Sequence, residues 1–270
     1  TQMKSPNCVI QFIKLQKFMK SNLIPSLLLI VLWAFLQSCK PVSEAQQIVD
    51  RSIEAHGGKL FETSNISFDF RDRQYEIFKS PSKFRYTREF SDSTGYVRDV
   101  LNNSGFVRTV DGEAVTLPED RVRAFTNSVN SVAYFTFLPY GLNDEAVFKT
   151  YLGEAELEGK KYNKVKVIFS EDGGGEDFDD VFIYWFNQET NLIDYLAYSY
   201  HTDGGGVRFR KAIRQHNVGG IVLQDYENYQ PADKNTPVED MENLFKEGKL
   251  ELLSEIILEN VVVELPVTKQ

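Results

Sequence analysis

Alternation of apolar and polar residues over many short runs is the feature that most constrains the fold of this chain. In the stretch NISFDF, which starts at Asn65, Ile66, Phe68 and Phe70 share one face, and the polar residues share the other. A two-residue period is typical of a β-strand with one buried and one solvated face. The same pattern recurs in QYEIFK, KFRYTREF, GYVRDVLN and GFVRTV, with turn residues between the runs. These runs predict an antiparallel meander.

A second set of strand patterns follows residue 160. It comprises KYNKVKVIFSE, DVFIYWFNQ, NLIDYLAYSYH, VRFRKAIRQHNV and GIVLQDYENYQ, and the tail adds KLELLSEIILENVVVELP. The run VFIYWF is apolar on both faces, which predicts an interior strand. The chain holds 20 Phe, 13 Tyr and 2 Trp. Most of these aromatic residues fall in the alternating runs, as expected for β-structure.

Four segments have helical patterns instead. The first begins after Ser43, a good N-cap residue, and ends at Gly57. The second lies between Pro118 and Pro139, where apolar residues recur at helical spacing. We expect a further helical turn or two around Asp144 to Thr150, and a short helix near Val238 to Lys246. Together with the meanders, these helices predict a mainly β, α+β fold.

The apolar run from Leu23 to Leu36 is 14 residues long and is broken only by Pro25 and Ser26. A membrane-spanning helix needs about 20 apolar residues, whereas the apolar core of a signal peptide needs roughly 7–15. We therefore interpret residues 1–38 as a leader and signal peptide, with Met19 as the expected start.

The run ends in Leu36-Gln37-Ser38-Cys39, which resembles the lipobox of bacterial lipoproteins. In that class the cysteine carries the lipid and becomes the new N-terminus, so we predict lipidation at Cys39. The alternative is an ordinary secretory signal with a chance cysteine. Lipid chains would anchor the protein because each buried methylene contributes about 0.8 kcal/mol.

Residues 39–270 are predicted to form a single domain, because no repeat or flexible linker divides them. Residues 1–38 contain four lysines and no acids, so the net charge of the remainder is 26 − 39 = −13. An acidic chain without a basic stripe argues against a nucleic-acid partner.

Several stretches together resemble an uncharacterised lipoprotein family of Bacteroidota. They are AHGG (55–58), YFTFLPYGLND (134–144), GKKYNKVKV (159–167), YWFNQETNLIDYLAY (184–198), RFR (208–210) and GGIVLQDYENY (219–229). With the lipobox and the two meanders, the chain also resembles the outer-membrane lipoprotein-sorting (LolA/LolB-like) fold. The resemblance implies a large antiparallel half-open β-barrel with plugging helices, preceded by an N-terminal helix. It also implies a place in the cell envelope, in the outer membrane, and a lipid or lipoprotein acyl chain as a partner.

The residues of the chain suggest no catalytic or metal site. His56, His201 and His216 lie outside any metal-ligand spacing, and the sequence has no nucleophile elbow or phosphate-binding glycine loop. We therefore expect no enzyme activity, no cofactor and no metal. The acidic stretch EDGGGEDFDD is interpreted as a solvated hairpin loop, with a calcium site as the alternative.

Arginines recur in the strand patterns, and two interpretations of them stay open. If several met on a concave face, they would clamp a phosphate or carboxylate head group. Otherwise they pair with acidic residues on a solvated face. The residues concerned are Arg85, Arg88, Arg98, Arg108, Arg208, Arg210 and Arg214.

A half-barrel of this kind would enclose an apolar ligand in a cavity lined by aromatic and aliphatic side chains. The candidates are Phe68, Phe70, Phe84, Tyr86, Val167, Phe169, Phe182, Tyr184 and Phe186. The same side chains could instead pack against the helices and leave no cavity. The leading hypothesis is a membrane-anchored envelope lipoprotein that binds a lipid or another apolar ligand. The alternative is a non-enzymatic structural or partner-binding module of an envelope complex.

Overall fold

The computed structural model describes residues 42–172 and 178–265, which from Ser43 onward belong to one compact unit. The predicted leader and Cys39 lie outside the described residues. Within those residues, no helix combines the length and the apolar character needed to cross a membrane.

The first of two sheets has seven antiparallel strands in the order β14-β1-β2-β3-β4-β5-β6. Six of them are the predicted first meander and its continuation. The strands are β1 (Asn65–Phe70), β2 (Arg73–Lys79), β3 (Phe84–Asp92), β4 (Gly95–Asn102), β5 (Gly105–Val110), β6 (Glu113–Ala114) and β14 (Leu258–Glu264).

The second sheet is also antiparallel and has the order β13-β12-β11-β10-β9-β8-β7. β9 has neighbours on both sides, as its apolar composition predicts. The strands are β7 (Val147–Leu157), β8 (Lys160–Phe169), β9 (Val181–Asn187), β10 (Ile193–Tyr200), β11 (Gly206–Val218), β12 (Ile221–Gln230) and β13 (Glu251–Ile256).

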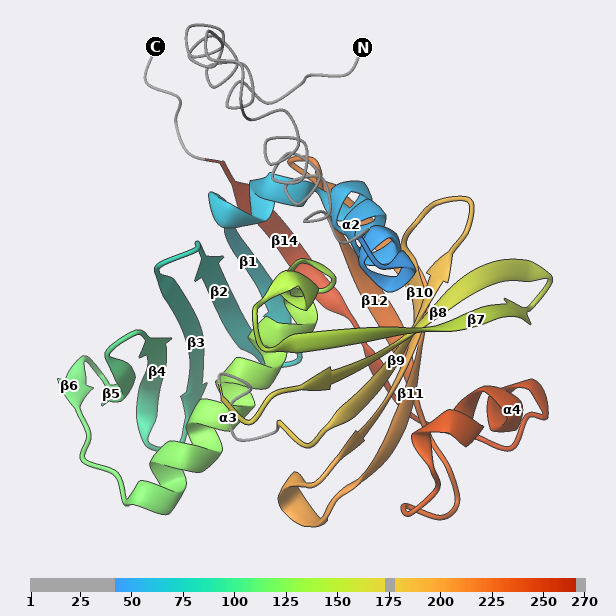
Figure 1. Ribbon diagram of the computed structural model, residues 1–270. Helices are drawn as coiled ribbons and strands as arrows, with labels where there is room; N and C mark the ends of the chain where they lie inside the picture. Colours follow the sequence, from blue (N-terminus) through green and yellow to red (C-terminus); the bar gives the residue numbers. More distant parts are fainter. Residues whose placement is uncertain (1–41, 173–177, 266–270) are drawn as a thin grey trace, which may run out of the picture. The chain divides into compact units, whose positions relative to one another are not determined.

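A single residue, Ile257, separates β13 of one sheet from β14 of the other. β13 pairs with β12 and β14 pairs with β1, so the two sheets meet along this C-terminal segment. The opposite edges, β6 and β7, do not pair with each other. The strands therefore form a half-open barrel, and the predicted fold class is confirmed (Figure 1).

Helix α2 (Glu44–His56) begins and ends where the sequence predicts. The Ser43 hydroxyl accepts a hydrogen bond from the Gln46 amide at 3.2 Å, which satisfies one free N–H of the first turn. Gly57 ends the helix with φ of 127°, and a Cβ there would lie 2.8 Å from the Gly220 carbonyl oxygen. Only glycine fits this combination of backbone angle and close approach.

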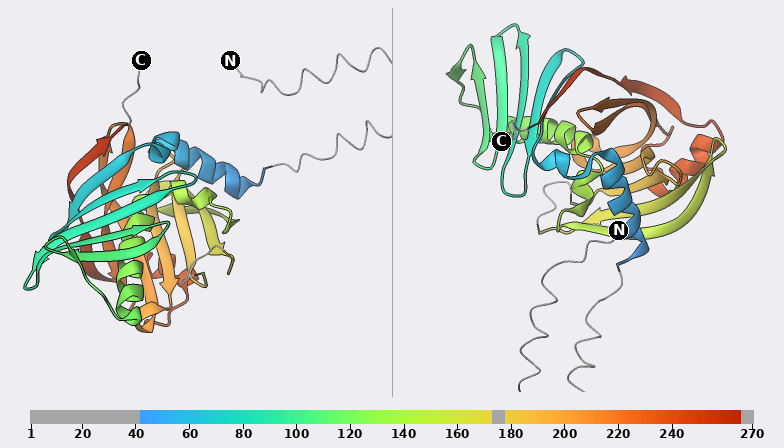
Figure 2. Two further views of the ribbon diagram at one scale, coloured as in Figure 1. Left: turned by 90° about the vertical axis from the view of Figure 1, so that its left-hand side faces the viewer. Right: turned by 90° about the horizontal axis from the view of Figure 1, so that it is seen from above.

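Helix α3 (Glu119–Thr136) lies between the two sheets and plugs the half-barrel (Figures 1 and 2). Its buried Val129 and Ala133 pack with the core of the first sheet, whereas Tyr134 and Phe135 pack against the core of the second. α3 therefore packs against the cores of both sheets, because it has apolar residues on two of its sides.

Two contacts fasten α3 to the first sheet. The Arg88 guanidinium on β3 donates a hydrogen bond from Nη1 to the Ser128 hydroxyl at 2.8 Å. The Arg108 guanidinium on β5 lies 3.7 Å from the centre of the Phe125 ring. The same two arginines hold Asp99, which is fully buried.

The second sheet is covered on its other face by the short helix α4 (Met241–Lys246). Phe245 stacks on Phe209 with ring centres 4.7 Å apart, and the Trp185 indole donates to the Glu242 carboxylate at 3.1 Å. This cover explains the composition of β9. Ile183 and Trp185 belong to the core under α4, while Phe182, Tyr184 and Phe186 belong to the core on the opposite face.

The helix predicted around Asp144 to Thr150 is wrong. The segment follows a short 3-10 helix, η4 (Tyr140–Asn143), and contains the start of β7 at Val147. β7 is an edge strand, and its residues alternate between half-buried and exposed as it pairs with β8. That pairing outweighs the local helical pattern, because strand preference depends mainly on neighbouring strands and burial.

Three further 3-10 helices complete the described chain: η3 (Gly58–Glu62), η5 (Thr202–Gly204) and η6 (Val238–Asp240). The tail helix predicted near Val238 to Lys246 is confirmed as η6 followed by α4.

Candidate functional site

A half-open cavity of about 480 Å³ lies between α3 and the concave face of the second sheet. Pockets that hold a small molecule in proteins typically measure 300–1,000 Å³, so this one is large enough for a ligand. Much of its wall is aromatic. The aromatic lining residues are Phe70, Tyr134, Phe135, Phe169, Phe182, Tyr198, Tyr200 and Tyr226.

The aromatic wall is built from α3 and from strands β9 and β10 of the sheet that faces it. Phe135 of α3 lies 5.3 Å from the ring of Tyr198 on β10, and Tyr198 stacks on Phe182 of β9 at 5.2 Å. The Tyr134 hydroxyl forms a 2.7 Å hydrogen bond with the hydroxyl of Tyr184. These contacts fix the rings in an apolar wall.

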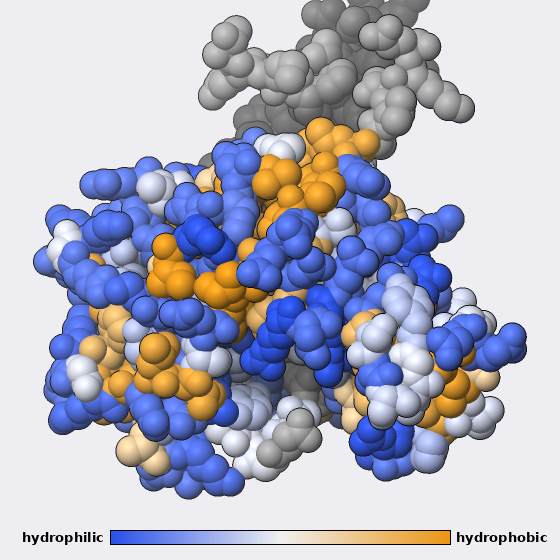
Figure 3. All heavy atoms as spheres, turned by 180° about the vertical axis from the view of Figure 1, so that it is seen from behind, coloured by the Kyte–Doolittle hydropathy of each residue, from blue (hydrophilic) through white to orange (hydrophobic). Residues whose placement is uncertain are grey.

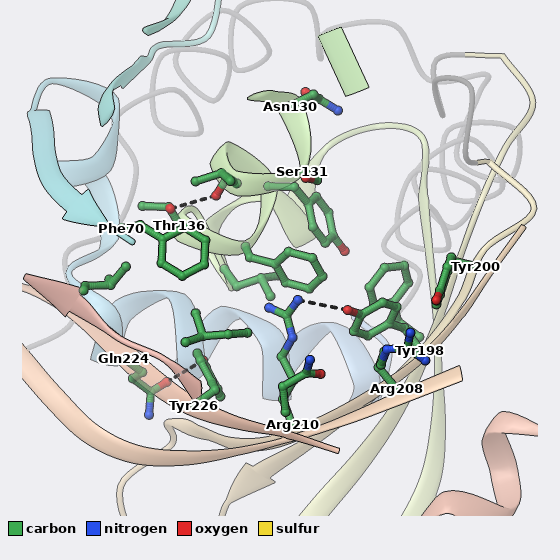
Figure 4. A pocket seen from close by; sticks show the side chains of 18 of the residues that line it. Phe70, Asn130, Ser131, Thr136, Tyr198, Tyr200, Arg208, Arg210, Gln224 and Tyr226 are labelled. Carbon is green, nitrogen blue, oxygen red and sulfur yellow. Dashed lines mark hydrogen bonds between the residues drawn. The ribbon is translucent and has the colours of Figure 1, made fainter. Parts of the chain in front are cut away.

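The floor of the cavity is formed by β10, β11 and β12. In the strand register Arg210 lies opposite Leu196 on one side and Asn228 on the other, and Arg208 lies opposite Tyr198. Residues two apart on a strand share a face, so both arginines are on the concave side. Figure 4 shows the Arg210 side chain rising from the sheet into the cavity.

Arg210 is the most unusual member of the site. Only 8% of its surface is exposed, yet among the described residues it has no carboxylate within ion-pair distance. Its Nη2 donates to the Tyr198 hydroxyl at 2.9 Å, and its guanidinium lies 3.6 Å from the centre of the Phe135 ring. Its buried Nε has no acceptor in the described part of the protein.

Two amides beside Arg210 are also incompletely bonded. Gln224 and Asn228 lie on β12 with Tyr226 between them, and all three line the cavity. The Gln224 carbonyl oxygen accepts from the Tyr226 hydroxyl at 3.2 Å, but the Gln224 side-chain nitrogen is buried without an acceptor. The Asn228 side-chain oxygen is buried without a donor among the described residues.

Behind this floor, His56 at the end of α2 connects to the site through Gln224. Its Nε2 lies 3.3 Å from the Gln224 carbonyl oxygen, and its Nδ1 lies 2.9 Å from the Ser52 carbonyl oxygen. Burial lowers the pKa of His56 below its ordinary value of 6.5. His56 is therefore a neutral structural residue, although the helix C-terminus alone would favour its charge.

One group of side chains in the described residues could offer ligands to a metal ion. Donor atoms of Asp179, Asp180 and His201 lie within 4.8 Å of one another, and Asp180 also lines the cavity. His201 is exposed and sits 3.5 Å from the Asp180 carboxylate. Residues 173–177 of the predicted acidic hairpin loop lie outside the described residues, so the calcium alternative stays a prediction.

The nine side chains that the sequence nominates for an apolar cavity divide into two groups. Phe70, Phe169 and Phe182 line the cavity. The other six do not. Val167, Tyr184 and Phe186 pack in the core of the second sheet, while Phe68, Phe84 and Tyr86 pack in or against the core of the first.

Sequence reasoning missed the polar floor on β12 and the contribution of α3. The stretch LQDYEN does carry a signal, because Gln224, Tyr226 and Asn228 recur with a period of two in a strand whose two faces are both buried. Amides at such positions need partners. Tyr134 and Phe135 gave no comparable signal, since a helix facing two sheets has no single apolar stripe.

The two interpretations of the strand arginines apply to different residues. Five of the seven form ion pairs with acidic residues. They are Arg85 with Glu76, Arg88 and Arg108 with Asp99, Arg98 with Glu89, and Arg214 with Asp225. The other two, Arg208 and Arg210, line the cavity instead.

A second cavity, of about 420 Å³, lies near α4 and is lined by residues such as Tyr229, Phe245 and Gly248. Lys211 and Glu158 in its wall are paired at 2.7 Å. On the face shown in Figure 3, hydrophilic residues predominate and apolar residues gather in a band. Exposed apolar side chains of β13 and β14 include Leu252, Leu253 and Val262.

Comparisons with known proteins identify a family and several similar structures. A family model described as "Family of unknown function (DUF6503)" matches residues 26–259. No curated protein matches the chain.

The similar solved structures are distant in sequence. A LolA superfamily protein from Nitrosomonas europaea has 12% identity over 83% of this chain and 96% of its own, with a TM-score of 0.48. A putative outer membrane lipoprotein-sorting protein domain from Vibrio parahaemolyticus has 6% identity over 83% and 93%, with a TM-score of 0.43. The lipoprotein LppX from Mycobacterium tuberculosis has 10% identity over 59% and 88%, with a TM-score of 0.28. With TM-scores below 0.5, these likenesses carry no argument about function.

Proposed function

The chain belongs to a protein family of unknown function, DUF6503. We propose that this protein binds an apolar or amphipathic ligand in the half-barrel. The cavity under α3 is the observation that supports this proposal. It measures about 480 Å³, is walled by aromatic rings and stays open to solvent on one side. Small-molecule sites are usually concave, mostly apolar and largely preformed.

The proposed role is binding rather than catalysis. Among the described residues that line the cavity, none is a histidine or a cysteine. The lining hydroxyls of Ser131 and Thr136 donate to backbone carbonyl oxygens of their own helix, at 3.1 and 2.8 Å. A hydroxyl without a neighbouring base is a poor nucleophile.

We also propose that the protein is held in the cell envelope by lipid on Cys39. The lipobox-like sequence supports this. The assignment to a Bacteroidota family rests on stretches such as AHGG and YFTFLPYGLND, and the assignment to the outer membrane rests on the resemblance to the lipoprotein-sorting fold. An anchored protein with a lipid-sized cavity would act as a receptor or a fixed binding site. These finer statements stay predictions.

Native mass spectrometry of the full chain tests the binding role. The chain would carry Cys39→Ser to prevent the predicted lipidation, and it would be purified without detergent. We expect an additional mass that is lost on collisional activation and matches a lipid, or that appears after incubation with 1-dodecanol. A bare chain that takes up neither a cellular lipid nor 1-dodecanol would contradict the proposal.

A matched pair of tryptophan variants assigns the binding to the cavity. Ser131 is exposed on α3 and lines the cavity, so Ser131→Trp should obstruct it and abolish the additional mass. Ala124 is exposed on the same helix but does not line the cavity, so Ala124→Trp should leave binding unchanged. Equal binding by both variants would place the ligand elsewhere.

A further inference from the structure

We infer that the ligand of this cavity is an anionic amphiphile, whose carboxylate or phosphate head group binds Arg210 while its chain lies against the aromatic wall. The inference rests on the proposed function and specifies the class of ligand. It rests on Arg210 in the cavity floor, which lacks a carboxylate partner among the described residues, and not on the apolar wall.

The first argument is the cost of the buried arginine. Arg210 is 92% buried, by difference from its 8% exposure, and no carboxylate among the described residues pairs with it. Its partners are a neutral hydroxyl on Tyr198 and the face of Phe135. A buried charge without a counter-ion is costly, whereas the other buried arginine, Arg88, is paired with Asp99 at 2.6 Å. A bound anion would supply the missing counter-charge.

The second argument is the unused donor of Arg210. Arg210 Nε is a buried N–H donor that lacks an acceptor among the described residues. The Arg210 side chain lines the cavity from β11, in its floor. Oxygen atoms of a carboxylate or phosphate accept from such donors, and guanidinium binds these anions with matched geometry. A neutral hydrocarbon would leave this donor unsatisfied.

The charge of the lining supports the same conclusion. Among the described lining residues, Arg71, Arg208 and Arg210 carry positive charge and Asp180 carries negative charge. Asp180 lies 3.5 Å from the Nδ1 of His201. The described lining is therefore positive by two charges although the chain as a whole is strongly acidic. Arg208, which lies over the Tyr200 ring at 5.2 Å, provides a second cation near the head group.

Titrations with three amphiphiles of one chain length test the head group. Dodecanoate, dodecyl phosphate and 1-dodecanol would be added below their micelle concentrations to the full chain carrying Cys39→Ser, with binding measured by calorimetry. We expect at least one of the two anions to bind about ten to a hundred times more tightly than the alcohol, as hydrogen bonds to a charged group predict. The stronger anion distinguishes a carboxylate from a phosphate head group.

Substitution of Arg210 separates the head-group inference from the proposed function. Arg210→Met should remove the preference for the anions over 1-dodecanol, and far-ultraviolet circular dichroism checks that the variant is folded. Arg85→Met is the control, because Arg85 is exposed and pairs with Glu76 outside the cavity. It should keep the preference.

Three other results would refute the head-group inference, and one of them would also refute the proposed function. If the original chain binds the alcohol and both anions equally, the head-group inference fails and the apolar cavity stands. If Arg210→Met keeps the preference for an anion, the anion binds elsewhere and the inference fails. If none of the three amphiphiles binds, the inference and the proposed function both fail.

Discussion

Replacing Asp99 by alanine is expected to destabilise the protein strongly. Asp99 lies on β4, is fully buried and accepts four hydrogen bonds from the guanidinium groups of Arg88 and Arg108 at 2.6–2.9 Å. Arg88 is only 2% exposed, and Asp99 is its only ion-pair partner among the described residues. Removing one partner of a buried ion pair costs about 3–5 kcal/mol. For a domain of this size that lowers the melting temperature by roughly 6–20 °C.

Urea denaturation followed by circular dichroism measures this free energy. The control is Glu89→Ala, because Glu89 pairs with Arg98 at 2.7 Å on the same sheet but in a pair that is partly exposed. Exposed pairs contribute about 0–1 kcal/mol, so the control should lose no more than that. If Asp99→Ala and Glu89→Ala cost the same, the argument from burial is refuted.

Three further predictions concern the folded state of the protein. Burial holds the folded pKa of His56 below its ordinary 6.5, so the unfolded chain binds more protons below pH 6.5. Stability should therefore fall as pH falls through that value, by up to about 1.4 kcal/mol at pH 5.5. Urea titrations at pH 7.5 and 5.5 check this, and His56→Gln should remove that dependence. Gly57→Ala should cost about 2 kcal/mol or more, because its Cβ would meet the Gly220 carbonyl oxygen. Gly112 has φ of 88° and open space where a Cβ would lie, so Gly112→Ala should lower the free energy of unfolding by only about 1–2 kcal/mol. Thermal melts of the two glycine variants check this difference. Glu242→Gln should cost roughly 1–3 kcal/mol, because its bonds to Lys164 and Lys246 lose their charge. Near-ultraviolet dichroism of Trp185 would report a loosened α4, and an unchanged spectrum with unchanged stability would contradict the prediction.

Most of the strands were predictable because their alternation is a local property of the sequence. NISFDF, for example, becomes β1 with Ile66 and Phe68 buried. β7 was not predictable in this way, because it is a strand through its pairing with β8. Val147, for instance, pairs with Phe169. Pairing over that distance leaves little trace in a short window of sequence.

The cavity was predictable as a class of site but not residue by residue. Phe70 and Phe68 follow the same pattern on one strand, yet Phe70 lines the cavity and Phe68 packs in the first core. What separates them is the position of α3, which depends on distant contacts such as Arg88 with Ser128. Whether Arg210 has a carboxylate partner also depends on distant contacts, because the fold decides which acidic residues lie near it.

The junction between β13 and β14 has a consequence for the time course of folding. Asn65 of β1 pairs with Glu264 of β14, and Tyr226 of β12 pairs with Ile256 of β13. Each sheet therefore gains one of its strands only after residues 251–264 have been made. Contacts over such long sequence separations slow folding. A chain whose two sheets both stay incomplete until that segment is made remains unfolded for longer, and an unfolded chain is the form in which a polypeptide can be threaded across a membrane.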